Sequence, residues 1–119
     1  MKQKCVEFMQ DLQSRDLNKI GEWFLENSEV WVPPASPVTG SNRILALFRA
    51  ILKRYNSIEW KVTEVHHLEQ NRYFYISESW GMTGKSIPYK NVVATDITFN
   101  PEGKIERLSD YFKDTAIFD

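Results

Sequence analysis

The hydrophobic pattern of this chain changes its period once, near residue 57. Before that point apolar residues recur every three or four positions, as in helices that bury one side. After it, apolar and polar residues alternate over several long segments, as in strands that bury one face. Helices followed by strands predict an α+β domain, in which a strongly bent, mainly antiparallel sheet packs over the helices.

Three helices are predicted in the first half of the chain. The first covers residues 2–14. Asp16 is the expected N-cap of a second, shorter helix that includes Trp23 and Phe24 and ends at Asn27-Ser28. The third helix begins after a cap at Ser41 or Asn42. Its apolar side is the broadest in the chain, and we interpret it as part of the core.

One short strand and four long strands are predicted. The short strand covers residues 29–32 and is stopped by two consecutive prolines. The long strands cover residues 57–68, 72–82, 91–99 and 104–112, and a Pro-Gly turn joins the last two as an antiparallel hairpin. Strand 72–82 has large apolar residues on both faces, so the pattern leaves open which face points inward.

Length and composition exclude several classes of protein. At 119 residues and 42% hydrophobic content, the chain is expected to form one domain, residues 1–119, with a real core. Its 15 basic and 16 acidic residues are interspersed, which argues against a nucleic acid or a membrane surface as partner. A single cysteine excludes an internal disulfide. With no signal-peptide pattern at the start, we expect a cytoplasmic protein.

Asp110 is the first candidate for chemistry, because alternation puts it on one face with Leu108 and Phe112. A carboxylate between large apolar residues either lines a cavity where it acts, or reaches water at the end of its strand. Glu78, if its face points inward, is a second acid that would raise the pKa of the pair. His66 is a third candidate, since it would share a face with Trp60 and titrate near neutral pH.

Large aromatic side chains are the candidates for a binding pocket, with core packing as the alternative. We expect them to favour a small, planar, apolar molecule with one polar end near Asp110. No cofactor and no metal site is expected, because the adjacent His66 and His67 would point to opposite faces of a strand. The candidate ligand-binding residues are Trp31, Phe48, Tyr55, Trp60, Trp80, Thr95 and Leu108.

The order of elements resembles the nuclear transport factor 2-like superfamily, most closely its SnoaL-like polyketide cyclases and limonene epoxide hydrolase. The resemblance implies a cone-shaped α+β barrel around a hydrophobic pocket, and in many members a homodimer through the sheet. Four motifs carry it, in this order: Asp16-Leu17, Trp23-Phe24 before Glu29-Val30-Trp31, Gly40, and Glu102-Gly103-Lys104-Ile105 before Asp110-Tyr111-Phe112.

The resemblance implies a role for Asp110 in particular. It falls where limonene epoxide hydrolase has an Asp of its catalytic group, and near the acid-base Asp of the cyclases. No Arg stands beside Glu78, where the hydrolase has one. Ketosteroid isomerases place a base, a Tyr and a protonated Asp at positions that correspond to Pro33, Phe8 and Thr95, so all three groups are absent.

Three function classes stay open at this point. An enzyme would use Asp110 as a proton donor or acceptor, a binding module would need the cavity without the acid, and a protein-interaction domain would need neither. A homodimer is expected in each case, because Tyr73, Tyr75, Ile105 and Tyr111 would otherwise expose aromatic and aliphatic surface.

Overall fold

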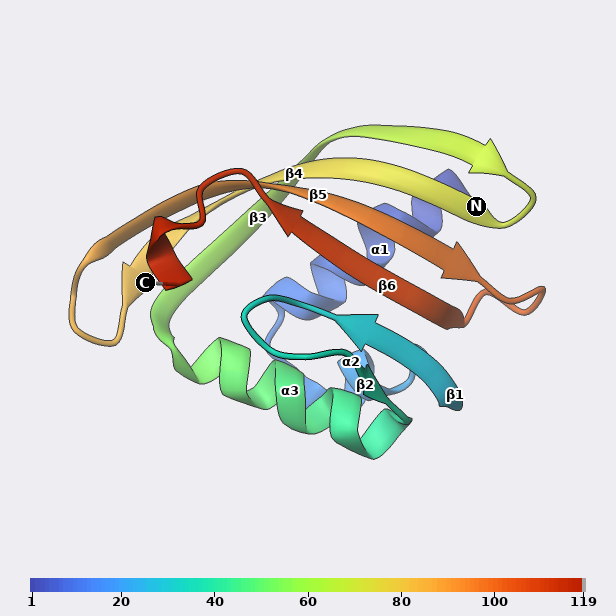
Figure 1. Ribbon diagram of the computed structural model, residues 1–119, viewed down its shortest axis with the longest axis horizontal. Helices are drawn as coiled ribbons and strands as arrows, with labels where there is room; N and C mark the ends of the chain where they lie inside the picture. The colour runs from blue at the N-terminus through green and yellow to red at the C-terminus, as the bar shows by residue number, and fades with distance from the viewer. Residues whose placement is uncertain (119) are drawn as a thin grey trace.

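The computed structural model describes residues 1–118, in which three helices pack on one side of a curved sheet of six strands (Figure 1). The predicted α+β fold is confirmed, and the sheet stays open rather than closing into a barrel. The elements are α1 (Lys2–Gln13), α2 (Leu17–Gly21), β1 (Phe24–Trp31), β2 (Val38–Thr39), α3 (Ser41–Lys53), β3 (Tyr55–Glu69), β4 (Arg72–Thr83), β5 (Pro88–Phe99), β6 (Ile105–Phe112) and the short 3₁₀ helix η1 (Ala116–Phe118).

The last strand lies inside the sheet. The strand order is β2-β1-β6-β5-β4-β3, and β6 pairs in parallel with β1 on one side and antiparallel with β5 on the other. The remaining pairs are antiparallel. Three neighbouring strands, β4, β5 and β6, therefore present their inner side chains together to the helices below them (Figure 1).

Capping residues in the sequence predict one helix start correctly and miss another by one residue. Asp16 caps α2 as expected, because its Oδ1 accepts hydrogen bonds from the N–H groups of Asn18 and Lys19. The N-cap of α3 is Gly40 rather than Ser41 or Asn42, and its φ of 100° suits a residue without a Cβ. Among residues 1–118, no helix is both long and apolar enough to cross a lipid bilayer.

The predicted extension of the second helix to Asn27-Ser28 is wrong, because α2 ends at Gly21 and the segment from Phe24 onward forms strand β1. The Ile105 N–H donates to the Trp23 carbonyl at 2.8 Å, and Phe24 pairs with Ile105 in the parallel ladder. Ser28 bridges a bulge in β1, since its hydroxyl donates to the Ile105 carbonyl and accepts from the Leu25 N–H. These backbone groups would be unpaired if the helix continued.

A bulge at Glu106 sets the faces of β6. Phe99 pairs with Ile105, whereas its neighbour Thr98 pairs with Arg107, so Glu106 has no partner opposite it. The extra residue shifts the alternation by one position, so residues after the bulge occupy the opposite face from the one that regular alternation gives. Ile105 and Leu108 are therefore both buried on the inner face, although regular alternation predicted opposite faces for them.

The inner face of β4 carries Tyr73, Tyr75, Ser77 and Ser79, all buried. This face points inward because Tyr75 pairs with Thr95, and partners across a ladder share a face. The predicted outward position of Tyr73, Tyr75 and Ile105 is thus wrong. Of the residues that suggested a dimer surface, Tyr111 alone is exposed.

Gly81 lies where the backbone of β3 closely approaches that of β4. A Cβ built at this position would stand 2.0 Å from the Ser57 carbonyl oxygen, which is backbone and cannot rotate away. We expect Gly81→Ala to lower the free energy of unfolding by at least about 2 kcal/mol, measured by urea denaturation.

Gly84 provides the matched control three residues further along the chain. The nearest atom to a Cβ there is the Arg54 carbonyl oxygen at 3.7 Å, an ordinary contact. Gly84→Ala should change stability by less than about 0.5 kcal/mol. Equal midpoints for the two variants would show that the close approach at Gly81 does not exist in solution.

Candidate active site

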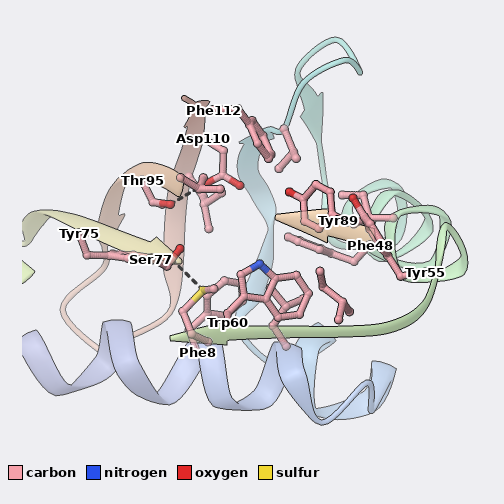
Figure 2. A pocket seen from close by; sticks show the side chains of 17 residues that line it. Phe8, Phe48, Tyr55, Trp60, Tyr75, Ser77, Tyr89, Thr95, Asp110 and Phe112 are labelled. Carbon is pink, nitrogen blue, oxygen red and sulfur yellow. Dashed lines mark hydrogen bonds between the residues drawn. The ribbon is translucent and has the colours of Figure 1, made fainter. Parts of the chain in front are cut away.

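A cavity of about 50 Å³ lies between the inner face of the sheet and the helices α1 and α3 (Figure 2). Side chains of α1 and α3 line one side, and strands β3 to β6 line the other. The lining is mainly apolar. Its residues are Phe8, Met9, Leu12, Val32, Phe48, Ile51, Tyr55, Ile58, Trp60, Tyr75, Ser77, Tyr89, Val93, Thr95, Leu108, Asp110 and Phe112.

Asp110 is the sole carboxylate among these lining residues. It stands opposite Thr95 in the β5–β6 ladder, and the Thr95 hydroxyl donates to its Oδ1 at 2.6 Å (Figure 2). Burial raises the pKa of the Asp110 carboxyl to about 6, and the hydrogen bond from Thr95 opposes this rise without cancelling it. Both protonation states of the carboxyl are therefore accessible close to neutral pH.

Tyr75 continues this polar row onto β4, because it pairs with Thr95 across the β4–β5 ladder. Its buried hydroxyl donates to Met9 Sδ at 3.2 Å and is also within hydrogen-bonding reach of Thr95. Burial, with the negative charge of Asp110 as a second cause, raises the pKa of Tyr75 well above its ordinary value. The phenol thus stays neutral beside the acid.

A second polar group lies on the other side of the cavity in Figure 2, where Tyr55 and Tyr89 meet. Their rings are 5.0 Å apart between centroids, and the Ser79 hydroxyl donates to the Tyr89 oxygen at 3.3 Å. Burial raises the pKa of Tyr55 to about 12, and the neighbouring Tyr89 adds to the rise through its charge and its hydrogen bond.

The cavity is small for a ligand site. An engineered protein cavity of about 150 Å³ admits benzene, whereas a single water needs roughly 10–15 Å³. At about 50 Å³ the present space holds a few waters. A ring-sized molecule can enter only when lining side chains move, so the aromatic residues both fill the interior and shape the site.

The structure brings six of the predicted site residues together around this cavity. Asp110 and Thr95 form its acidic end, and Tyr55 belongs to the second polar group. The others supply apolar walls: Phe48, Trp60 and Leu108.

Glu78 and Trp80 do not line the cavity, because the inner face of β4, which the sequence left open, is the opposite one. Both lie on the outer face of β4, because the pairing of Tyr75 with Thr95 turns the alternate residues inward. Trp31 is also directed away from the cavity, with 47% of its surface exposed at the end of β1.

His66 is displaced by a bulge in β3. The ladder shifts between Val62 and Glu64, so Val65 takes the inner position and His66 pairs with Phe74 on the outer face. Its side chain is exposed and contacts Glu64 Oε1 at 2.8 Å. Among residues 1–118, no group of three or more His, Cys, Asp or Glu side chains is arranged to hold a metal ion.

Sequence reasoning missed Tyr75, Ser77 and Tyr89 as cavity residues. One signal could have found Tyr75 and Ser77. Strand 91–99 has one clearly apolar face, and pairing it with the preceding strand in a hairpin requires the facing residues of that strand to point the same way. Tyr89 lies at the start of β5, two residues before the point at which the sequence predicts the strand to begin.

The sequence model of the SnoaL-like domain matches residues 6–108 of the chain. A search of the curated proteins found no match. Solved structures with the same fold include SalBIII, an epoxide hydrolase/cyclase-like enzyme of pyran ring formation in the polyether salinomycin (15% identity, 96% of this chain and 91% of that chain, TM-score 0.83). An LEH-like epoxide hydrolase of M. tuberculosis has 17% identity over 98% of this chain and 83% of that chain, with a TM-score of 0.77.

The structure named "Putative SnoaL-like polyketide cyclase" from Shewanella denitrificans OS-217 has 14% identity over 98% of this chain and 93% of that chain, with a TM-score of 0.80. At these identities the likeness shows the fold alone.

The raised pKa of Asp110 predicts a pH dependence of stability. In the unfolded chain the carboxyl ionises near its ordinary pKa, so between about pH 4 and pH 6 the folded state binds the proton more tightly. The wild type should therefore lose stability, relative to Asp110→Asn, as the pH rises through this window. The loss should reach at most about 3 kcal/mol in urea unfolding at each pH.

Glu78→Gln is the control, because it removes an exposed carboxylate from the outer face of β4. Its pH profile should follow that of the wild type. A parallel profile for Asp110→Asn and wild type would show that the Asp110 carboxyl is well hydrated in solution.

Proposed function

Because the chain belongs to the SnoaL-like domain family, we propose that it binds a small, apolar molecule in the cavity and that Asp110 transfers a proton to or from it. The observation that carries this proposal is the carboxyl itself, which lines an apolar cavity on a half-buried residue and has its pKa raised to about 6. A group with such a pKa exchanges its proton at neutral pH as an acid or as a base.

The chemistry of the similar proteins agrees with this role. One acts in pyran ring formation and another is an epoxide hydrolase. Closing an ether ring or opening an epoxide requires proton transfer at an oxygen atom, and one positioned carboxyl can supply it. The apolar walls would bind the carbon skeleton, while Thr95 holds the carboxyl in one orientation.

A binding role without turnover is the alternative. It is favoured by the lining, which offers no second carboxylate and no histidine or lysine to assist Asp110. A binding module would keep the cavity and the polar row but would not depend on a titratable proton. The two proposals differ in their prediction for a variant without that proton: the enzyme would lose turnover, whereas the binding module would bind its ligand as before.

Asp110→Asn separates them, because the amide keeps the shape of the side chain and removes its titratable proton. We expect compounds found by thermal shift with the wild type to bind the variant also. Turnover of a substrate among them should fall by about a hundredfold or more in the variant. In the wild type the rate should rise through about pH 6 if the carboxylate acts as base, and fall there if the acid acts.

Glu78→Gln again serves as the control and should retain wild-type turnover. Equal turnover by Asp110→Asn and wild type would exclude Asp110 as the acid-base group. Binding by both proteins without turnover by either would establish the binding role instead.

We also propose that the protein forms a homodimer through the outer face of the sheet. Ile76, Ala94 and Tyr111 form one cross-strand row there, and Trp80 lies further along β4 with 39% of its surface exposed. A second copy would cover this apolar row. The partner surface differs from the one first expected, because Tyr73 and Tyr75 belong to the core.

Light scattering across the micromolar range tests the dimer. We expect the mass of two chains for the wild type and of one chain for Trp80→Glu, which places a charge on the outer face. Ile87→Glu is the matched control, since Ile87 is exposed in the loop between β4 and β5, and it should stay dimeric. A wild-type monomer would disprove the proposal.

A further inference from the structure

Three hydroxyl groups meet beside the cavity, and the proposed proton transfer uses none of them. Tyr89 is buried at the start of β5, Ser79 is buried on β4, and Tyr55 stands at the start of β3. The Ser79 hydroxyl donates to Tyr89, and the rings of Tyr89 and Tyr55 are 5.0 Å apart between centroids. We call these three residues the hydroxyl triad.

The hydroxyl triad has at least one proton more than its own hydrogen bonds use. Three hydroxyls carry three protons, and Ser79 uses one of them in its bond to Tyr89. Even if the two phenols also bond to each other, one phenol O–H remains free to donate. Both phenols line the cavity, so this donor is available to a bound molecule.

The hydroxyl triad and Asp110 belong to different parts of one site. Tyr89 and Thr95, the partner of Asp110, are six residues apart on β5, which separates their backbones by about 20 Å. The side chains of Tyr55, Tyr89, Thr95 and Asp110 all reach the same small cavity, and Figure 2 shows the two phenols to one side of Asp110 and Thr95. The cavity lining thus holds two polar groups among apolar side chains.

We propose that the hydroxyl triad is a subsite that binds a carbonyl oxygen of the substrate, separate from the atoms that react at Asp110. The substrate is then a small apolar molecule with two oxygen functions, one for each polar group. This inference rests on the proposed function, whose cavity and acid it shares.

The chemistry of the subsite selects an uncharged acceptor. A neutral phenol donates a hydrogen bond to a carbonyl, and the pKa of about 12 keeps Tyr55 neutral at physiological pH. An anionic group would need a counter-charge, and none of the lining residues is Lys, Arg or His. A purely apolar end would leave the remaining O–H without a partner.

Two matched ring compounds test the subsite, 4-hydroxyacetophenone and 4-ethylphenol. Both have a phenol hydroxyl for Asp110, and only the first has a carbonyl oxygen at the opposite end. With about ten non-hydrogen atoms, each is expected to bind with a Kd of a few millimolar or tighter. Amide chemical shifts in NMR titrations give both affinities, and we expect the wild type to prefer the ketone by about fivefold.

The double variant Tyr55→Phe/Tyr89→Phe should lose this preference and keep its affinity for 4-ethylphenol. Tyr73→Phe is the matched control, because it deletes the same atom from a buried tyrosine of β4 that does not line the cavity. It should keep the fivefold preference. If the double variant does not fold, at least one of the two single variants should prefer the ketone by less than twofold.

Several results would overturn the subsite: equal affinities in the wild type, no binding of either compound to it, or a preference that persists in the double variant. Asp110→Asn distinguishes this failure from failure of the proposed function. A ketone preference in wild type and Asp110→Asn, with equal turnover by both, rejects the acid role and retains the subsite. Loss of turnover in Asp110→Asn, without a ketone preference in the wild type, supports the acid role and rejects the subsite.

Discussion

The position of Asp110 depends on the bulge at Glu106. In a regular strand, residues three apart lie on opposite faces, so Ile105 and Leu108 could not both reach the core. If Ile105 kept its place between β1 and β5 without the bulge, Asp110 would face outward. One extra residue thus lets β6 bury an aliphatic side chain at its start and present a carboxylate to the cavity further along.

The resulting site works against the stability of the fold. A carboxyl that loses its water and gains one hydrogen bond, from Thr95, is less stable when ionised than it would be in solvent. Tyr75 adds a neutral hydroxyl to the same row without adding a compensating charge. Such an arrangement is typical of a position kept for chemistry, because an apolar residue there would pack at no electrostatic expense.

The fold and part of the site could be predicted from sequence, and the exceptions have physical reasons. Asp110 and Thr95 were placed correctly because β5 and the second half of β6 each have one clearly apolar face. Strand β4 has two such faces, so alternation alone could not decide the direction of Glu78. His66 was misplaced by a bulge whose one trace in the sequence is the three-residue spacing of Val62 and Val65.

The residue at position 81 affects the shape of the cavity, although it does not line the cavity itself. A side chain at this position would push the Ser57 carbonyl away, and Ser57 lies two residues after Tyr55. Divergence at position 81 would therefore displace the segment that carries one phenol of the cavity, even where the tyrosine itself is retained. Among homologous sequences, a glycine at this position together with both tyrosines is thus a compact marker for relatives that share the same pocket shape.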